Sequence, residues 1–347
     1  MAFRYIGSKL RLAHAIVEQV GRPNHGRFVD VFCGTGAVAE VAARSGWPVH
    51  LNDHLKSATT IAAARLVSSR QAQFTSFGGY AGAVREMNAV KGRRGFVWSE
   101  YSPASAKHAG VERRYFSEGN ARKIDGMRLA LESWYAGGRL TETEHLVLLA
   151  DLLGATNKVA NTAGTYGCFM SRWQPQALQV IEILPRLMPI EAPPFTVTSL
   201  DATDVECRTE DVVYLDPPYT KRQYAAYYHI LETIALGDAP DVTGVGGIRP
   251  WRDKASDYCY RTRAVGALRD LVAGIPSRRV LLSYSDEGHV PLDELESVLS
   301  PLGRVVVKPL MSIGRYRPNA TASRRGSAVE EVLICIDRAA AGFEVAA

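Results

Sequence analysis

The sequence of 347 residues predicts an α/β fold, a Rossmann-like sheet with an inserted, mostly helical domain. Strand, glycine turn, helix, strand and acid follow one another between Arg27 and Asp53, which is how such sheets begin. From about residue 69 to residue 189 the pattern becomes helical and irregular, and strand signals return after it. We therefore expect residues 1–68 and 190–347 to form one domain, and residues 69–189 to be inserted into it.

The N-terminal part carries the clearest alternation of elements. Ser8 can cap a first helix that ends at Gly21 and Pro23, and its predicted apolar face comprises Leu10, Ala13, Ile16, Val17 and Val20. The run RFVDVF is β-branched and aromatic, which predicts a strand. A glycine turn then leads into the helix GAVAEVAARSG, the run PVHL predicts a second strand, and an Ala-rich helix extends to about Leu66.

The insertion and the C-terminal part differ in periodicity. Within the insertion, TETEHLVLLADLLGATNKVAN is the clearest helix. Strand runs recur at residues 195–200, 212–215, 279–283, 304–307 and 329–336, and we expect them to join one parallel sheet. Residues 237–250 are rich in Gly, Pro and Asp, which predicts a mobile loop.

Composition narrows the class of protein. Charges interrupt the N-terminus before any apolar stretch develops, so we expect no signal peptide, no membrane span and a cytoplasmic location. Five scattered cysteines, without a C-x-x-C pair, favour free thiols and no metal site. The net charge is only +5, but residues 75–175 hold thirteen Lys and Arg against nine Asp and Glu, interleaved with aromatics. This mixture fits a nucleic-acid surface or, equally, a solvated face over an aromatic core.

The first candidate binding site is Asp30-Val-Phe32-Cys-Gly34-Thr-Gly36, directly after a predicted strand. Glycines let the backbone approach a cofactor, and the helix N-terminus behind them offers free N–H donors. Asp53 ends the next strand, where an acid can accept both ribose hydroxyls of a nucleoside. The glycine turn and Asp53 together favour a nucleoside cofactor. The plain alternatives are a tight turn without function and an Asp53 side chain that caps its helix.

The strongest motif is Asp216-Pro217-Pro218-Tyr219, which follows the apolar run 212–215. Two prolines fix the backbone, so the Asp216 carboxylate and the Pro217 carbonyl point outward. These acceptors suit the two N–H groups of a planar amine, whose lone pair then faces an electrophilic methyl group, while Tyr219 can stack on the attached ring. A Pro-Pro turn with an Asp cap is the structural alternative, but α/β sheets bind ligands at the carboxyl ends of central strands.

Together these motifs resemble the Dam-like, alpha-order family of N6-adenine DNA methyltransferases. Tyr5-Ile-Gly7-Ser-Lys9 is similar to the family's N-terminal Y-x-G-x-K, the glycine turn to its F-x-G-x-G, and residues 216–219 to its catalytic D-P-P-Y. The long insertion before D-P-P-Y is typical of the alpha order. The segments RQYAAYYHILETIA, YFSEGNARKIDGMR and ATNKVANTAGTYGCF resemble the branch that accompanies restriction enzymes.

The resemblance implies a class I methyltransferase sheet, S-adenosyl-L-methionine as cofactor and residues 69–189 as the target recognition domain. The catalytic residues would be Asp216, Pro217, Pro218 and Tyr219, and the cofactor-binding residues Tyr5, Lys9, Asp30, Phe32, Gly34, Gly36, Asp53 and Asp201. Asp53 would hold the ribose and Asp201 the adenine edge, while Lys9 could hold the methionine end or a DNA phosphate. The substrate would be double-stranded DNA with a flipped adenine. A cognate restriction endonuclease could be a partner, no membrane is implied, and we expect a monomer or a weak dimer.

Three other interpretations stay open. An RNA adenine-N6 methyltransferase would use the same D-P-P-Y, although the long insertion favours DNA. A cytosine-N4 enzyme more often has Ser in place of Asp216, and intact Asp216 and Tyr219 argue against a catalytically silent DNA-binding relative. Weaker expectations are DNA contacts by Asn157, Asn161, Tyr166, Arg315, Arg317, Arg324 and Arg325, each with a plain structural alternative, and a structural role for His229.

Overall fold

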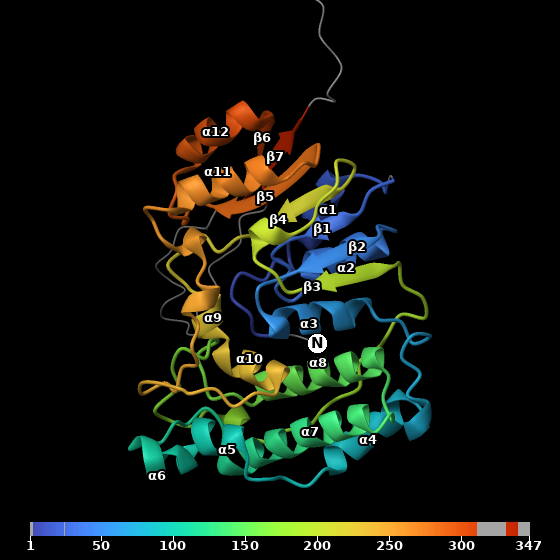
Figure 1. The fold of residues 1–347 in the computed structure, drawn as a ribbon, viewed down its shortest axis with the longest axis vertical. Coiled ribbons are helices and arrows are strands. Elements are labelled where there is room, and N and C mark those ends of the chain that lie inside the picture. The colour runs from blue at the N-terminus through green and yellow to red at the C-terminus, as the bar shows by residue number, and fades with distance from the viewer. Residues whose placement is uncertain (1–2, 24, 311–330, 339–347) are drawn as a thin grey trace, which may run out of the picture. The chain divides into compact units, whose positions relative to one another are not determined.

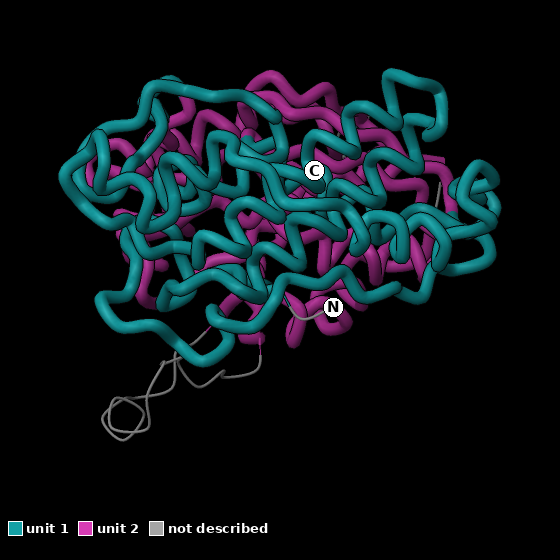
Figure 2. The backbone as a smooth tube through the Cα atoms, turned by 90° about the horizontal axis from the view of Figure 1, so that it is seen from below, with its two compact units in different colours: residues 1–8, 55–192, 224–253 teal, residues 9–54, 193–223, 254–347 magenta. Residues whose placement is uncertain are grey.

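The computed structural model describes residues 3–23, 25–310 and 331–338. Arg315, Arg317, Arg324 and Arg325 lie outside the described residues. The chain divides into two compact units, which Figure 2 colours separately. The sheet unit comprises residues 9–54, 193–223 and 254–347, and the helical unit comprises residues 1–8, 55–192 and 224–253.

Within its described residues, the sheet unit holds one sheet with the strand order β3-β2-β1-β4-β5-β7-β6 (Figure 1). The strands are β1 Phe28–Asp30, β2 Val49–Asn52, β3 Phe195–Thr198, β4 Val212–Leu215, β5 Arg279–Ser285, β6 Arg304–Pro309 and β7 Glu331–Asp337. β1 to β5 pair in parallel, whereas β7 runs antiparallel between β5 and β6. The prediction of an entirely parallel sheet was therefore wrong for β7, because an apolar run buried on both faces carries no signal of direction.

The α-helices of the sheet unit, as far as its residues are described, are α1 Ala13–Val20, α2 Ala37–Arg44, α11 Ala264–Gly274 and α12 Leu292–Leu299. Short 3-10 turns, η4 Ala202–Asp204, η6 Asp257–Cys259 and η7 Ser300–Leu302, connect other elements. α11 and α12 lie together over the β5–β7 end of the sheet (Figure 1), where Leu268 and Leu295 join a core with Val213 and Ile334. Helix α1 starts after Leu12, so the predicted Ser8 cap was wrong.

The helical unit is built around α8. Its α-helices are α3 Lys56–Leu66, α4 Tyr80–Ala89, α5 Phe96–Tyr101, α6 Ala106–Ala109, α7 Glu118–Ala136, α8 Glu142–Lys158, α9 Tyr224–Tyr227 and α10 His229–Leu236. The 3-10 turns are η1 Thr75–Phe77, η2 Pro103–Ser105 and η3 Pro175–Leu178, and η5 Arg252–Lys254 lies at the unit's boundary. α8 packs against α3, α7 and α10, and a capping box between Thr141 and Glu144 fixes its start. Across the described residues, none of the helices combines the length and apolarity that crossing a bilayer requires.

Aromatic side chains of the helical unit form its core. Tyr101, Tyr115 and Tyr166 are buried, which supports the aromatic-core alternative for these rings. Asn161 is buried too, and its side-chain amide donates to the carbonyls of Arg114 and Met170 at 3.0 Å each. The structure contradicts the expectation that Asn157, Asn161 and Tyr166 contact DNA, because all three are buried and hydrogen-bonded within this unit.

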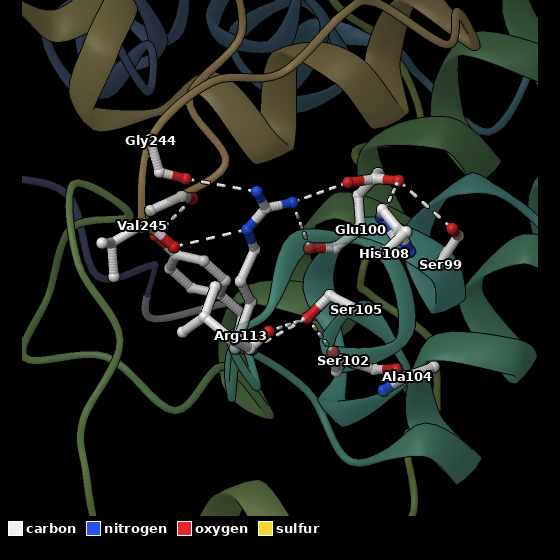
Figure 3. A network of polar contacts seen from close by, with 12 residues as sticks. Ser99, Glu100, Ser102, Ala104, Ser105, His108, Arg113, Gly244 and Val245 are labelled. Atoms are coloured by element: carbon white, nitrogen blue, oxygen red, sulfur yellow. Dashed lines mark hydrogen bonds and ion pairs between the residues drawn. The ribbon is translucent and has the colours of Figure 1, made fainter.

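The Gly-rich segment 237–250 contains an anchored turn rather than the mobile loop that its composition predicts. Thr243 and Ile248 form an antiparallel bridge across the turn. The buried Arg113 guanidinium donates to the Gly244 and Val245 carbonyls at 3.2 and 3.3 Å, and it pairs with Glu100 at 2.6 Å (Figure 3). A composition rich in Gly, Pro and Asp signals a turn, and the contacts that fix it come from elsewhere in the sequence.

Candidate active site

The glycine turn lies directly after β1, in the sheet unit. Gly34 and Gly36 have φ values of 50° and 73°, in the left-handed region that a side chain disfavours. Asp53 follows β2, and its Oδ2 accepts the Gly34 backbone N–H at 3.0 Å. The structure therefore brings together the turn and the acid that sequence analysis paired, and Asp53 holds the turn in shape.

Asp30 ends β1 beneath this turn and is 1% exposed. Burial raises the pKa of its carboxyl well above the usual range, and the nearby carboxylates of Asp216 and Asp53 raise it further. Hydrogen bonds from the backbone N–H groups of Phe32 and Ala39 oppose the shift. Among the described residues, no hydrogen-bond partner faces Asp30 Oδ1. A buried carboxyl group with a raised pKa and one unsatisfied oxygen thus lies under the turn.

The Asp-Pro-Pro-Tyr motif begins at the carboxyl end of β4, the strand beside β1. Strands β1, β2 and β3 extend from this point in one direction and β4 and β5 in the other, so the motif lies at the switch point of the sheet. Pro217 is buried, and Pro218 and Tyr219 are half-buried. The Tyr219 ring packs on Tyr284 with centroids 5.6 Å apart, and its backbone carbonyl accepts the His289 N–H at 2.8 Å.

Lys9 connects this motif to a second acid. Its Nζ lies 3.2 Å from Asp216 Oδ1 and 3.1 Å from Glu331 Oε2. Its ammonium also lies 5.3 Å from the centroid of the Tyr219 ring, and the Tyr219 hydroxyl donates to Glu331 Oε1 at 3.2 Å. We call Lys9, Asp216, Tyr219 and Glu331 the acceptor cluster. One cation thus serves two carboxylates.

Burial and charge set the protonation of this cluster. Burial raises the pKa of Asp216 to about 6, Lys9 opposes the rise, and Glu331 adds to it. Burial alone would lower the pKa of Lys9, but Asp216, Tyr219 and Glu331 together raise it above its usual value. Near neutral pH, therefore, the ammonium is charged and most Asp216 side chains are ionised. An ionised Asp216 can accept an N–H hydrogen bond.

The other predicted site residues have local partners. Phe32 meets Tyr258 edge to face at 5.5 Å. Asp201 caps η4, because its Oδ1 accepts the Thr203 N–H at 3.0 Å. Tyr5 belongs to the helical unit, where its ring stacks on Tyr228 with centroids 4.3 Å apart. In the described part of the chain, no group of three or more His, Cys, Asp or Glu side chains could hold a metal ion.

Glu331 was not among the residues predicted from the sequence. A parallel β7 would have placed its first residue at the opposite edge of the sheet from Asp216. Because β7 is antiparallel, Glu331 pairs with Ser285 at the carboxyl end of β5 and lies at the same edge as Asp216. In the sequence, Glu331 is recognisable only as an acid at the start of an apolar strand run. That pattern alone does not show whether the acid belongs to the site.

Comparison with known proteins places this arrangement in a family. The family model described as D12 class N6 adenine-specific DNA methyltransferase matches residues 5–297. Modification methylase LlaI of Lactococcus lactis subsp. lactis is 33% identical over 95% of this chain and 54% of its own length. Type II methyltransferase M.FokI of Planomicrobium okeanokoites is 32% identical over 86% of this chain and 47% of its own length.

A third relative is matched over most of its length. Type II methyltransferase M.NlaIII of Neisseria lactamica is 30% identical over 86% of this chain and 88% of its own length. The chain thus spans about half the length of LlaI and M.FokI and most of M.NlaIII. With a family model that covers the glycine turn and the Asp-Pro-Pro-Tyr motif, the chain belongs to the D12 class of N6 adenine-specific DNA methyltransferases.

Proposed function

We propose that this chain transfers a methyl group from S-adenosyl-L-methionine to the N6 amine of an adenine flipped out of double-stranded DNA. One observation carries the proposal: the Asp216 carboxylate lies at the carboxyl end of β4, beside the glycine turn that follows β1. Family membership supports the reaction class. The position of Asp216 would place an acceptor for the amine next to the glycine turn, which suits a nucleoside.

The residues around the glycine turn fit such a cofactor. Gly34 and Gly36 remove side chains from the turn, and the unsatisfied Oδ1 of the buried Asp30 marks unused hydrogen-bonding capacity beneath it. We propose that this turn and Asp53 hold the cofactor, together with Tyr5, Lys9, Phe32 and Asp201. When bound, S-adenosyl-L-methionine supplies an electrophilic methyl group on a sulfonium. The carboxylates of Asp53 and Asp216 suit a cationic ligand.

Asp216, Pro217 and Tyr219 would bind the adenine amine and ring. The Asp216 carboxylate would accept one N–H and the Pro217 carbonyl the other, which exposes the nitrogen lone pair. Flipping the base costs a few kcal/mol, and stacking on Tyr219 returns roughly 1–3 kcal/mol. The rate of methyl transfer would then depend on the positioning of the amine and the methyl group rather than on a strong base.

Residues 69–189, which belong to the helical unit, are the proposed target recognition domain. This long insertion before the Asp-Pro-Pro-Tyr motif would provide the dedicated surface that reading a duplex site needs. The relatives are named modification methylases or Type II methyltransferases, which supports a cognate restriction endonuclease as a partner in the cell. A monomer or weak dimer remains our expectation for the chain itself.

Incorporation of tritiated methyl groups into DNA tests the proposal. We expect the purified chain to label DNA, and the Asp216→Ala variant to lose at least about a hundredfold in rate. The matched control is Asp270→Ala, which removes an exposed carboxylate on α11. Among the described contacts, this carboxylate pairs only with its neighbour Arg269, at 2.7 Å. An Asp216→Ala variant that labels DNA as fast as this control would refute the acceptor role of Asp216.

A further inference from the structure

Glu331 makes two side-chain contacts inside the acceptor cluster. Oε2 accepts from Lys9 at 3.1 Å and Oε1 accepts from the Tyr219 hydroxyl at 3.2 Å. Its side chain is 13% exposed, so both contacts are shielded from water. Charge-assisted hydrogen bonds of this kind are stronger than neutral ones. The two carboxylate oxygens therefore fix two different groups at once.

The backbone of Glu331 is held independently of these contacts. Glu331 pairs with Ser285 in the antiparallel ladder, and its carbonyl accepts the Leu310 N–H at 2.8 Å. The strand end consequently does not need the carboxylate. A buried charge costs stability through desolvation. A purely structural role therefore does not explain why an acid, rather than an apolar residue, occupies this position.

The balance of charge around Lys9 indicates a role for the Glu331 carboxylate. In the structure Lys9 touches both Asp216 and Glu331. An amine that donates to Asp216 competes with the Lys9 ammonium for the same carboxylate. With Glu331 present, the ammonium keeps a counter-charge 3.1 Å away when Asp216 turns to the amine. Without it, Lys9 would remain bound to Asp216, because a buried cation must stay paired.

We propose that Glu331 is a positioning residue for methyl transfer, which holds the Tyr219 ring and retains the Lys9 ammonium so that Asp216 is available to the target amine. The inference rests on the proposed function, and it goes beyond the Asp-Pro-Pro-Tyr motif by adding an acid from β7. Glu331 acts through Tyr219 and Lys9 and does not itself touch the reacting atoms.

Three substitutions separate the two contacts. Glu331→Gln keeps an acceptor for the Tyr219 hydroxyl but removes the charge, Glu331→Ala removes both, and Tyr219→Phe removes only the hydroxyl. The matched control is Glu296→Gln, an exposed acid on α12. We expect kcat to fall about tenfold or more in Glu331→Gln and further in Glu331→Ala. The dissociation constant for S-adenosyl-L-methionine, measured by calorimetry, should change less than about threefold in Glu331→Gln.

The pH profile gives a readout that a structural role would not move. The groups that act on Asp216 are Lys9, which lowers its pKa, and Glu331, which raises it, and Asp216 in turn acts on Asp30, Tyr214 and Tyr219. Loss of the Glu331 charge should therefore move the acid limb of kcat/KM to lower pH. A second expectation is that Tyr219→Phe costs less in the Glu331→Ala background than in wild type, because the two changes remove one shared contact.

The outcomes separate this inference from the proposed function. If wild type forms no N6-methyladenine, the proposed function fails. If wild type is active and Glu331→Gln matches the Glu296→Gln control in kcat and in pH profile, Glu331 has no positioning role and the inference is overturned. A lower kcat in Glu331→Gln, together with an acid limb of kcat/KM at lower pH than in wild type, supports the positioning role of Glu331. Glu331→Gln decides the question even where Glu331→Ala folds poorly, because it preserves shape and one hydrogen bond.

Discussion

The Lys9 ammonium lies 3.2 Å from Asp216 Oδ1, so the carboxylate that we assign to the target amine already faces a cation. Both groups belong to the sheet unit, and both side chains are largely shielded, at 5% and 16% exposure. The pair keeps a buried acid ionised near neutral pH, which burial alone would oppose. The predictions for activity follow from this balance.

The pH dependence of wild-type activity is the first prediction. Asp216 must be ionised to accept an N–H, and its pKa is raised to about 6. Protonation below that value removes the acceptor, so kcat/KM should be constant from pH 7 to 8 and fall as the pH drops through 6. Initial rates of methyl incorporation between pH 5 and pH 8 measure this limb. A profile that is flat down to pH 5 would show that Asp216 does not need to be ionised.

Removal of Lys9 should move this limb in the opposite direction from removal of Glu331. Lys9 lowers the pKa of Asp216, so Lys9→Met should raise that pKa further above its ordinary value. Activity at pH 7 would then fall and recover in part at pH 9. The nearby exposed cation Arg11 offers a matched control as Arg11→Met, which should leave the profile unchanged. A Lys9→Met profile that overlays wild type would contradict the ion pair.

Asp30 should affect stability in a pH-dependent way. Asp30→Ala leaves the N–H groups of Phe32 and Ala39 without their acceptor, at about 1–3 kcal/mol for each unsatisfied group. Asp30→Asn keeps an acceptor and should cost less. The raised pKa means that folded Asp30 stays neutral where the unfolded residue is ionised, so wild type loses stability as the pH rises above about 4. Urea unfolding at pH 5 and pH 8 measures this effect. The free energy of unfolding of Asp30→Asn should rise relative to that of wild type between pH 5 and pH 8. The same difference between the two proteins at both pH values would refute a raised pKa.

The Arg113 contacts that hold the turn at residues 243–248 predict a stability difference between neighbours. Arg113→Ala removes the buried cation beside Glu100, whose other carboxylate oxygen keeps its contacts with His108 and Ser99. It also frees the Gly244 and Val245 carbonyls, at a cost of about 1–3 kcal/mol for each group left unsatisfied. Arg114→Ala removes an exposed pair with Glu112 and should cost about 1 kcal/mol or less. Urea denaturation of the two variants compares them directly. Equal losses would mean that the burial of Arg113 has no energetic effect.

Local patterns predicted the elements that form the site. The run before Asp216 was predicted with the bounds that β4 has, because four apolar residues lie between Asp211 and Asp216. The glycine turn was predictable for a similar reason, since only glycine adopts the conformations of Gly34 and Gly36 without strain.

Features that depend on distant pairing were not predictable. The direction of β7 is set by its neighbours β5 and β6, and its sequence is equally apolar in either direction. The contact between Glu331 and Lys9 joins residues 322 positions apart and follows from that direction. Asn161 illustrates the same limit, because its polarity suggested a surface and its hydrogen bonds to distant carbonyls place it inside the helical unit.

Nucleoside analysis of DNA treated with the purified chain and S-adenosyl-L-methionine is the most direct measurement. After enzymatic digestion, mass spectrometry should find N6-methyldeoxyadenosine with wild type and at most a trace with Asp216→Ala. Methylated cytosine in its place, or equal N6-methyldeoxyadenosine with both proteins, would contradict the assignment of Asp216 as the acceptor of the adenine amine.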